Sequence, residues 1–161
     1  MNHNPARFLQ LFRRPVAFAF FLLRNLPAAY FSGVRVVSAT EQECVVKIPY
    51  KWFSRNPFRS TYFACLSMAA EMSTGVLALA QVYKRQPSVS MLVVKVESEY
   101  FKKATGKTMF TCTCGNDFRV AVEEAIATGE SRTVSAVSEG INKEGERVAA
   151  FKITWSFRVK K

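Results

Sequence analysis

The clearest pattern in the chain is an alternation of apolar and polar residues near its C-terminal end. From Ala149 to Val159 every second residue is apolar, and Lys, Thr, Ser and Arg separate the later ones. This period of two is typical of a strand with one buried face. Residues 131–142 have the same strand character and precede it across a Lys-Glu-Gly-Glu turn. We therefore predict a β-hairpin formed by residues 131–142 and 147–161.

Shorter valine-rich segments predict the remaining strands. Residues 34–40 and 44–50 are separated by a polar Glu-Gln-Glu turn, which favours a second hairpin. Residues 89–100 alternate, and residues 105–114 continue in the same style. On the first of these segments we expect one face to carry Leu92, Val94 and Val96, and the other to carry Val93, Lys95, Glu97 and Glu99. Residues 116–129 leave two alternatives open, a short helix or an irregular connection between strands.

A long apolar segment between the strands predicts a central helix. It runs from about Ser60 to about Val82; Pro57 and small polar residues precede it, and Pro87 prevents its continuation. A helix that is apolar nearly all round must be covered on most sides. About six antiparallel strands are available to cover it, so we predict an α+β fold in which one sheet curls around this helix.

The N-terminal segment, residues 5–31, has several interpretations. Its apolar run from Pro15 to Leu23 is nine residues long, whereas a transmembrane helix needs about 20. A secretory leader can be that short and stays an open alternative. Steps of three and four instead favour a helix with an apolar stripe, made of Phe8, Leu11, Phe12, Val16, Phe20 and Leu23.

This stripe could cap the domain, cover a pocket or lie on an anionic membrane through the neighbouring arginines. We expect it to pack on the protein's own core, and we keep peripheral membrane contact as the alternative. The predicted organisation is an N-terminal helical extension, residues 1–32, followed by one domain, residues 33–161. A chain of 161 residues is long enough for a single such domain.

The formal net charge is +11, which predicts anionic partners of some kind. A basic, aromatic loop at residues 51–60 could stack on the bases of a single-stranded nucleic acid. Loops of this composition more often pack at a dimer edge or a pocket rim, so we do not expect a nucleic-acid partner.

The histidine and cysteine content excludes several kinds of chemistry. His3 is the one histidine of the chain, and it stands at the N-terminus. A zinc site would have too few ligands at the usual spacings, and a Ser-His-Asp or Cys-His arrangement would lack its imidazole. We expect no metal and no cofactor. The four cysteines are interpreted as reduced and buried, which favours a cytoplasmic protein.

Glu71 is the one acidic residue between Phe53 and Gln81, in the middle of the predicted helix. A buried carboxylate is costly without partners, so its presence requires a reason. Its side of the helix carries small residues that leave room for a ligand, namely Ala64, Ser67, Thr74, Gly75 and Ala78. One hypothesis is a catalytic or ligand-binding acid with Ser67 and Thr74 close to the substrate. The other is an acid hydrogen-bonded to Ser67 or Thr74 at a subunit contact.

Two segments carry a resemblance to a known family. In residues 55–75 an asparagine-containing loop leads into the long helix, and the carboxylate follows two to three turns later. Residues 139–157 form a closing hairpin around a glycine turn. Together with the order of elements over residues 33–159, they resemble the hot-dog fold of acyl-CoA thioesterases and dehydratases. The chain is most similar to a branch of thioesterases whose activity is not characterised.

The resemblance implies a sheet of about six antiparallel strands around the central helix, with the N-terminal helix added. It also implies a homodimer or a dimer of dimers that hydrolyses acyl-CoA or another acyl thioester. Glu71 falls on the helix carboxylate that acts as nucleophile or general base. Asn56 falls on the loop asparagine that orients substrate or water. The amides near Phe63 and Ala64 fall where backbone N–H groups polarise the thioester carbonyl.

One departure from the family pattern suggests an alternative function. Many thioesterases carry His-Gly-Gly where this chain has Tyr62-Phe63-Ala64. Tyr62 could donate a hydrogen bond to a carbonyl, but the missing glycines favour a second hypothesis, a non-catalytic acyl- or lipid-binding module. In either case the phosphates of CoA would bind basic residues drawn from Arg55, Arg59, Lys84, Arg85, Lys102 and Lys103.

Overall fold

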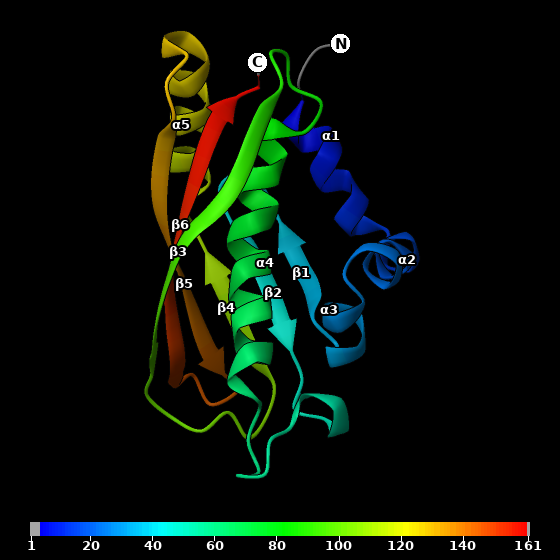
Figure 1. The fold of residues 1–161 in the computed structure, drawn as a ribbon. Coiled ribbons are helices and arrows are strands. Elements are labelled where there is room, and N and C mark those ends of the chain that lie inside the picture. Colours follow the sequence, from blue (N-terminus) through cyan, green and yellow to red (C-terminus); the bar gives the residue numbers. More distant parts are fainter. Residues whose placement is uncertain (1–3, 161) are drawn as a thin grey trace.

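The computed structural model describes residues 4–160, so His3 lies outside the described residues. Six antiparallel strands form one sheet in the order β1-β2-β4-β5-β6-β3 (Figure 1). Their bounds are β1 Arg35–Ala39, β2 Cys44–Ile48, β3 Val89–Tyr100, β4 Thr108–Cys112, β5 Arg132–Asn142 and β6 Arg147–Val159. The predicted α+β fold and both predicted hairpins, β1–β2 and β5–β6, are confirmed.

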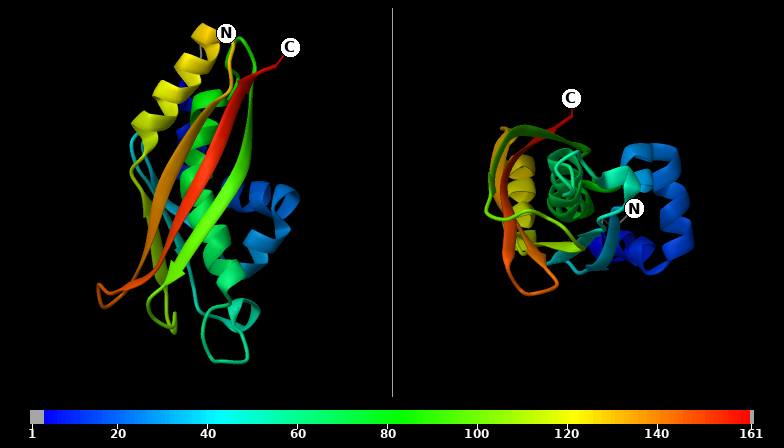
Figure 2. Two further views of the ribbon diagram at one scale, coloured as in Figure 1. Left: turned by 60° about the vertical axis from the view of Figure 1, so that its left-hand side comes forward. Right: turned by 90° about the horizontal axis from the view of Figure 1, so that it is seen from below.

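The sheet curls around helix α4, Phe63–Val82, as predicted (Figure 2). Within residues 4–160 this is the one helix long and apolar enough to span a bilayer, and most of it is buried inside the protein. The helix begins three residues later than Ser60 because residues 55–61 close a loop. The Thr61 amide and hydroxyl both donate to the Ala104 carbonyl, which holds the chain away from helical geometry.

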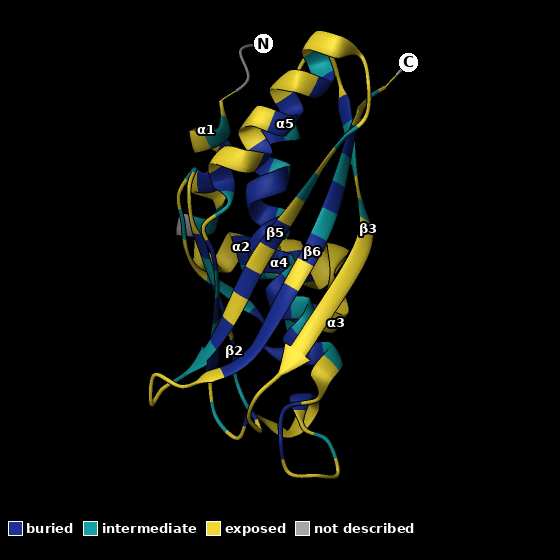
Figure 3. Cartoon of the chain, turned by 90° about the vertical axis from the view of Figure 1, so that its left-hand side faces the viewer, coloured by how far each residue is buried: buried dark blue, intermediate teal, exposed yellow. Residues whose placement is uncertain are grey.

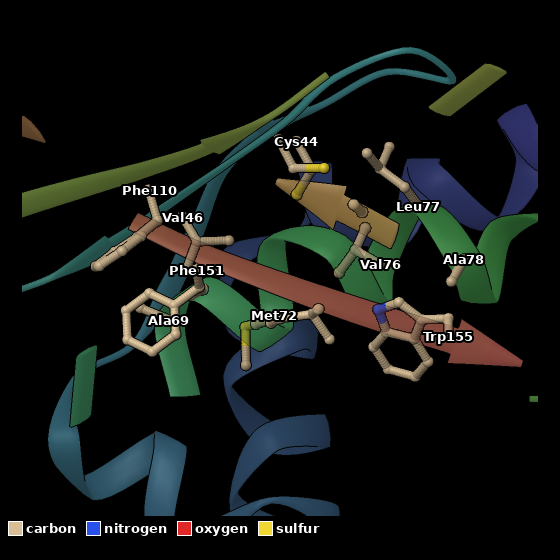
Figure 4. Close-up of a cluster of buried hydrophobic side chains, with 14 of the residues drawn as sticks. Cys44, Val46, Ala69, Met72, Val76, Leu77, Ala78, Phe110, Phe151 and Trp155 are labelled. Atoms are coloured by element: carbon tan, nitrogen blue, oxygen red, sulfur yellow. The ribbon is translucent and has the colours of Figure 1, made fainter. Parts of the chain in front are cut away.

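The core lies between α4 and the concave face of the sheet. Phe151 and Trp155 project from β6 toward Ala69, Met72 and Val76 of the helix (Figure 4). The alternation predicted for residues 149–159 is confirmed, since every second side chain of β6 from Ala149 to Phe157 is buried. This packing fixes the rotation of α4 and with it the direction in which each helix residue points.

Residues that the sequence left open form a second helix, α5, Gly115–Thr128. It packs on the same face of the sheet as α4, with Phe118 against Phe157 at a ring-centroid distance of 5.9 Å. Gly129 ends it in the left-handed conformation that favours glycine. Gly115 lies so close to the backbone of Glu41 that no side chain would fit.

Strand β3 departs from the predicted alternation at a β-bulge. Val93 and Lys95 face consecutive residues of β6, so Val94 is an extra residue on its strand. The bulge shifts the pattern by one position, and Val96 therefore lies on the helix side of the sheet, on the face opposite to Leu92. The prediction that Leu92, Val94 and Val96 share one face is wrong for Val96.

The N-terminal segment is a layer of short helices and not one continuous helix. It contains α1 Pro5–Leu9, a 3-10 turn η1 Gln10–Arg13, α2 Pro15–Asn25 and α3 Pro27–Ser32. Each α-helix begins with a proline, which is favoured at the first helical position and lacks the N–H that a continuing helix would need. The apolar stripe predicted for one continuous helix is therefore divided between a surface facing the core and a surface facing solvent.

The layer covers α4 on the side that faces away from β5 and β6 (Figure 2). Phe8, Phe18 and Leu22 of the layer are buried in the core, so the segment packs on the protein's own core as expected. Val16 and Phe20, in contrast, are 70% and 69% exposed. Helix α2 thus has one face toward the core and an apolar face toward solvent.

Candidate active site

The Glu71 side chain lines a cavity of about 230 Å³ between α4, the N-terminal layer and strands β3 and β6. It is the one charged group among the lining residues, which are otherwise apolar: Phe8, Leu11, Phe12, Ala17, Phe18, Phe21, Leu22, Leu26, Met72, Gly75, Val76, Leu79, Met91 and Trp155. A second hollow of about 210 Å³, lined by Asn25, Pro27 and Met68 among others, reaches Glu71 from the junction of α2 and α3. Glu71 therefore borders both hollows.

Burial away from water raises the pKa of Glu71, because it disfavours the charged form of the carboxylate. Among the described residues no hydrogen bond or ion pair reaches its carboxylate oxygens. The Thr74 hydroxyl donates instead to the main-chain carbonyl of Glu71 at 3.0 Å. A partly buried carboxylate with a raised pKa and no fixed partner is suited to accept and return a proton.

Gly75 makes room for this carboxylate one turn further along the helix. A Cβ atom at Gly75 would lie 3.0 Å from Glu71 Oε1 and 3.3 Å from Cζ2 of Trp155. The indole is fixed in place, since its Nε1 donates to the Thr74 hydroxyl at 3.0 Å. The absent side chain of Gly75 therefore leaves a slot between the indole and the carboxylate.

Thr74 supports this arrangement from within the core. Its hydroxyl donates to the Glu71 carbonyl and accepts from Trp155, and its side chain is fully buried. Neither cavity beside Glu71 includes it. The structure thus places Thr74 behind the carboxylate, where it positions Trp155. Ser67, the other neighbour expected near substrate, is partly buried and lines neither cavity.

Asn56, Tyr62 and Phe63 line a separate cleft of about 830 Å³. The cleft lies between the loop before α4 and the end of β3, and its rim carries the basic residues Arg55, Lys102 and Lys103. Lys102 is paired with Glu146, its Nζ lying 2.6 Å from Oε1. The remaining positive charge makes the rim a suitable place for an anionic group.

The Asn56 side chain organises the loop that forms this cleft. Its Oδ1 accepts from the amides of Phe58 and Ser60 at 3.0 and 3.2 Å, and from the Ser60 hydroxyl at 3.2 Å. These bonds occupy the oxygen and fix the orientation of the amide group. Its Nδ2 has no partner among the described residues and is the part of the group left to contact a ligand.

The start of α4 offers backbone donors next to Asn56. Tyr62 is the N-cap residue, and its side chain makes no capping hydrogen bond. The first amides of a helix lack intrahelical acceptors, so the N–H groups of Phe63 and Ala64 are available to a ligand at the positive end of the helix dipole. Tyr62 and Phe63 are 46% and 56% exposed, which leaves this helix end open to solvent.

One chain does not bring the predicted catalytic groups together. Glu71 and Phe63 are eight residues apart on the same helix, a separation of about 12 Å along its axis. The carboxylate and the helix-start amides also line different cavities. Each chain therefore presents two half-sites, one with the acid and one with Asn56 and the amide donors.

The sequence did not reveal the walls of the acid half-site. Trp155 could be recognised only as a residue of the alternating strand, and Gly75 only as a small neighbour of Glu71. The proline at each helix start is the signal that could have divided the N-terminal segment. Within residues 4–160 no three His, Cys, Asp or Glu side chains lie close enough to hold a metal ion.

This architecture, a curled antiparallel sheet around one long helix, is the hot-dog fold of acyl thioesterases, as the sequence predicted. The chain belongs to the family DUF4442, a domain of unknown function, whose sequence model matches residues 17–157. No curated protein matches the sequence.

Solved structures share the fold over nearly the whole chain. A protein of unknown function from Pseudomonas aeruginosa, described as a probable thioesterase, has a TM-score of 0.74 at 19% identity and covers 99% of this chain and 100% of its own. A thioesterase from Haemophilus influenzae has a TM-score of 0.64 at 11% identity, with coverages of 91% and 92%. A protein from the Escherichia coli phenylacetic acid degradation operon has a TM-score of 0.64 at 14% identity, with coverages of 95% and 96%. At these identities the likeness establishes the fold alone.

Proposed function

We propose that this protein is a thioesterase that hydrolyses acyl-CoA or another acyl thioester. The observation that carries the proposal is Glu71, a carboxylate with a raised pKa at the wall of an otherwise apolar cavity. Acyl thioesters combine an apolar chain with a carbonyl that a base-activated nucleophile attacks. Two of the solved structures with this fold are described as thioesterases, which supports the same class of reaction.

In the proposed mechanism Glu71 acts as general base or as nucleophile. As base it takes a proton from water while the water oxygen attacks the thioester carbon. The negative charge on the carbonyl oxygen is stabilised by the helix-start amides, and Asn56 orients the substrate or the water. The carbon–sulfur bond then breaks, and the proton returns from Glu71 to the leaving thiolate. The products are the free acid and the thiol.

This mechanism requires a second copy of the chain. Strand β3 lies at the edge of the sheet and is exposed along most of its length (Figure 3). A free edge of twelve residues presents unpaired N–H and C=O groups, which favour pairing with another strand. Antiparallel pairing of two β3 strands would join the half-sites, with Glu71 from one subunit and the amides from the other. Sedimentation of the wild type as a monomer would contradict this assembly.

Helix α2 supplies a surface for the membrane contact that we propose in addition. Its outward residues Val16 and Phe20 are flanked by the exposed Arg14 and Arg24. The first acidic residue of the chain is Glu41, so this surface combines apolar and positive groups. That combination favours an anionic lipid surface.

A second candidate function is binding of acyl or lipid ligands without catalysis. The Phe63 side chain is more than half exposed at the helix start, where glycines would let a carbonyl approach the backbone closely. A bulky group at this point hinders the approach that the oxyanion donors require.

The test is hydrolysis of acyl-CoAs of graded length by the wild type, Glu71→Gln and Glu123→Gln. Glu123 is a matched control, because it is an exposed glutamate of α5 paired with Arg119. We expect the first variant to lose roughly 10²- to 10⁴-fold in kcat/KM, the usual contribution of a general base. The control should keep the wild-type rate. Equal rates in all three proteins would refute the role of Glu71, and fatty ligand bound without any turnover would favour the non-catalytic function.

A further inference from the structure

We propose that the N-terminal layer builds the acyl-chain site of this protein, an apolar cavity that accepts a linear chain of about nine carbons. The identity of the head group rests on the proposed function, whereas binding of the chain itself does not. The layer would then select the substrate by length.

The cavity is bounded by the layer on one side and by the hot-dog core on the other. Phe18 and Leu22 of α2 form part of its wall and are buried, so this wall is anchored to the core. Phe8 of α1 stacks near Tyr83 at a centroid distance of 4.8 Å and closes another side. Without the layer, the Glu71 surface of α4 would lack this wall and no cavity would exist beside the carboxylate.

The lining makes a hydrocarbon the fitting occupant. Every lining side chain except Glu71 is apolar, so water inside would find few hydrogen-bond partners. An empty apolar cavity is unfavourable because the atoms of its wall lack packing contacts on one side. An alkyl chain would restore those contacts, with its carbonyl end at Glu71 and its methyl end among the phenylalanines of the layer.

The volume of the cavity sets the length of the alkyl chain that it can hold. A cavity of ~150 Å³ holds benzene, with its six carbons. The cavity beside Glu71 measures about 230 Å³, which scales to about nine carbons at the same packing. Each methylene transferred into it should strengthen binding about fourfold until the cavity is full.

Two alanines of α2 provide a matched pair of variants. Ala17 lines the cavity at its solvent-exposed side, whereas Ala19 lines a separate hollow of about 380 Å³ on the outer face of the same helix. Ala17→Phe would place a six-carbon ring in the cavity and leave room for about three carbons. Ala19→Phe makes the same change on the outer side. Leu79→Phe narrows the cavity from α4 and replaces Ala17→Phe if that variant does not fold.

The experiment measures binding of n-alkanols from ethanol to dodecanol by calorimetry, followed by the chain-length profile of acyl-CoA hydrolysis. Alkanols carry no thioester, so their binding is independent of catalysis. For the wild type and Ala19→Phe we expect affinity to rise about fourfold per carbon and to level off near nine carbons. For Ala17→Phe the plateau should move to shorter chains by several carbons.

The outcomes separate this inference from the proposed function. If the alkanol plateau moves to shorter chains in Ala17→Phe and no thioester is hydrolysed, the result supports the chain site and refutes the thioesterase activity. Hydrolysis with no alkanol binding, or with the same length profile in Ala17→Phe and Ala19→Phe, overturns the chain site alone. An affinity that rises all the way to dodecanol without a plateau also overturns it.

Discussion

Replacement of Gly75 by alanine should separate stability from activity at this site. Gly75 lies inside α4, where alanine is favoured over glycine by about 0.5–1 kcal/mol. Its new Cβ would lie 3.0 Å from Glu71 Oε1, whereas ordinary contacts begin at 3.4 Å and extend to 4 Å. Trp155 is held by its hydrogen bond to Thr74, so the glutamate side chain must move.

The size of this movement gives the expected loss of activity. The carboxylate must shift by about 0.4 Å, the difference between 3.0 Å and the 3.4 Å at which ordinary contact begins. A displacement of ~1 Å at a catalytic group costs about 100-fold in rate. We therefore expect kcat/KM of Gly75→Ala to fall about sixfold. The free energy of unfolding should stay equal or rise slightly.

Urea denaturation and acyl-CoA hydrolysis measure the two quantities on the same preparation. Gly106→Ala is the control, because a Cβ at Gly106 meets no atom within 4 Å. It should change neither activity nor the position of Glu71. A Gly75→Ala protein that retains the wild-type rate, while Glu71→Gln loses it, would show that the slot beside Trp155 does not set the position of the carboxylate.

Two further predictions concern charge and surface. Folding raises the pKa of Glu71, so its carboxyl group ionises at a lower pH in the unfolded chain than in the folded chain. The stability that is present below the unfolded pKa is therefore lost as the pH rises through the window up to the folded pKa. Glu71→Gln should remove this loss, so above that window its free energy of unfolding in urea should exceed that of the wild type by about 1.36 kcal/mol for each pH unit that the window spans. A wild type that is equally stable on both sides of the window would contradict the effect. Phe20→Ser should lower the fraction of protein that sediments with vesicles containing anionic lipid. Leu92→Ser should not lower it, although the Leu92 side chain on the sheet is about as exposed as that of Phe20. Equal binding by both variants would rule out α2 as the contact.

The sequence predicted those parts of the fold that follow from one local pattern. The alternation from Ala149 to Phe157 identified β6 because its inward side chains all lie in the core beneath α4 and α5. The apolar segment around Glu71 identified α4 for the same reason. Both patterns arise because one element faces one continuous core.

Other parts depend on contacts that no local pattern contains. The bulge at Val94 breaks the alternation of β3, and its presence follows from pairing with β6. Ser60 and Thr61 resemble a helix start, yet Thr61 bonds to Ala104, 43 residues away. The half-sites show the same limit. The sequence identified Glu71 and Asn56 as candidates, but it did not show that they line different cavities. The distance between Glu71 and the helix-start amides is set by the rise of the folded helix α4.

Trp155 also gives the site its own optical reporter. The chain has two tryptophans, and Trp52 is 75% exposed whereas Trp155 is 4% exposed. The emission of the buried indole is therefore distinguishable from that of the exposed one, which dissolved quenchers reach freely. Because the ring of Trp155 borders both the cavity and the slot of Gly75, occupancy of the cavity changes the surroundings of this one fluorophore. Ligand entry can thus be followed by intrinsic fluorescence without any label.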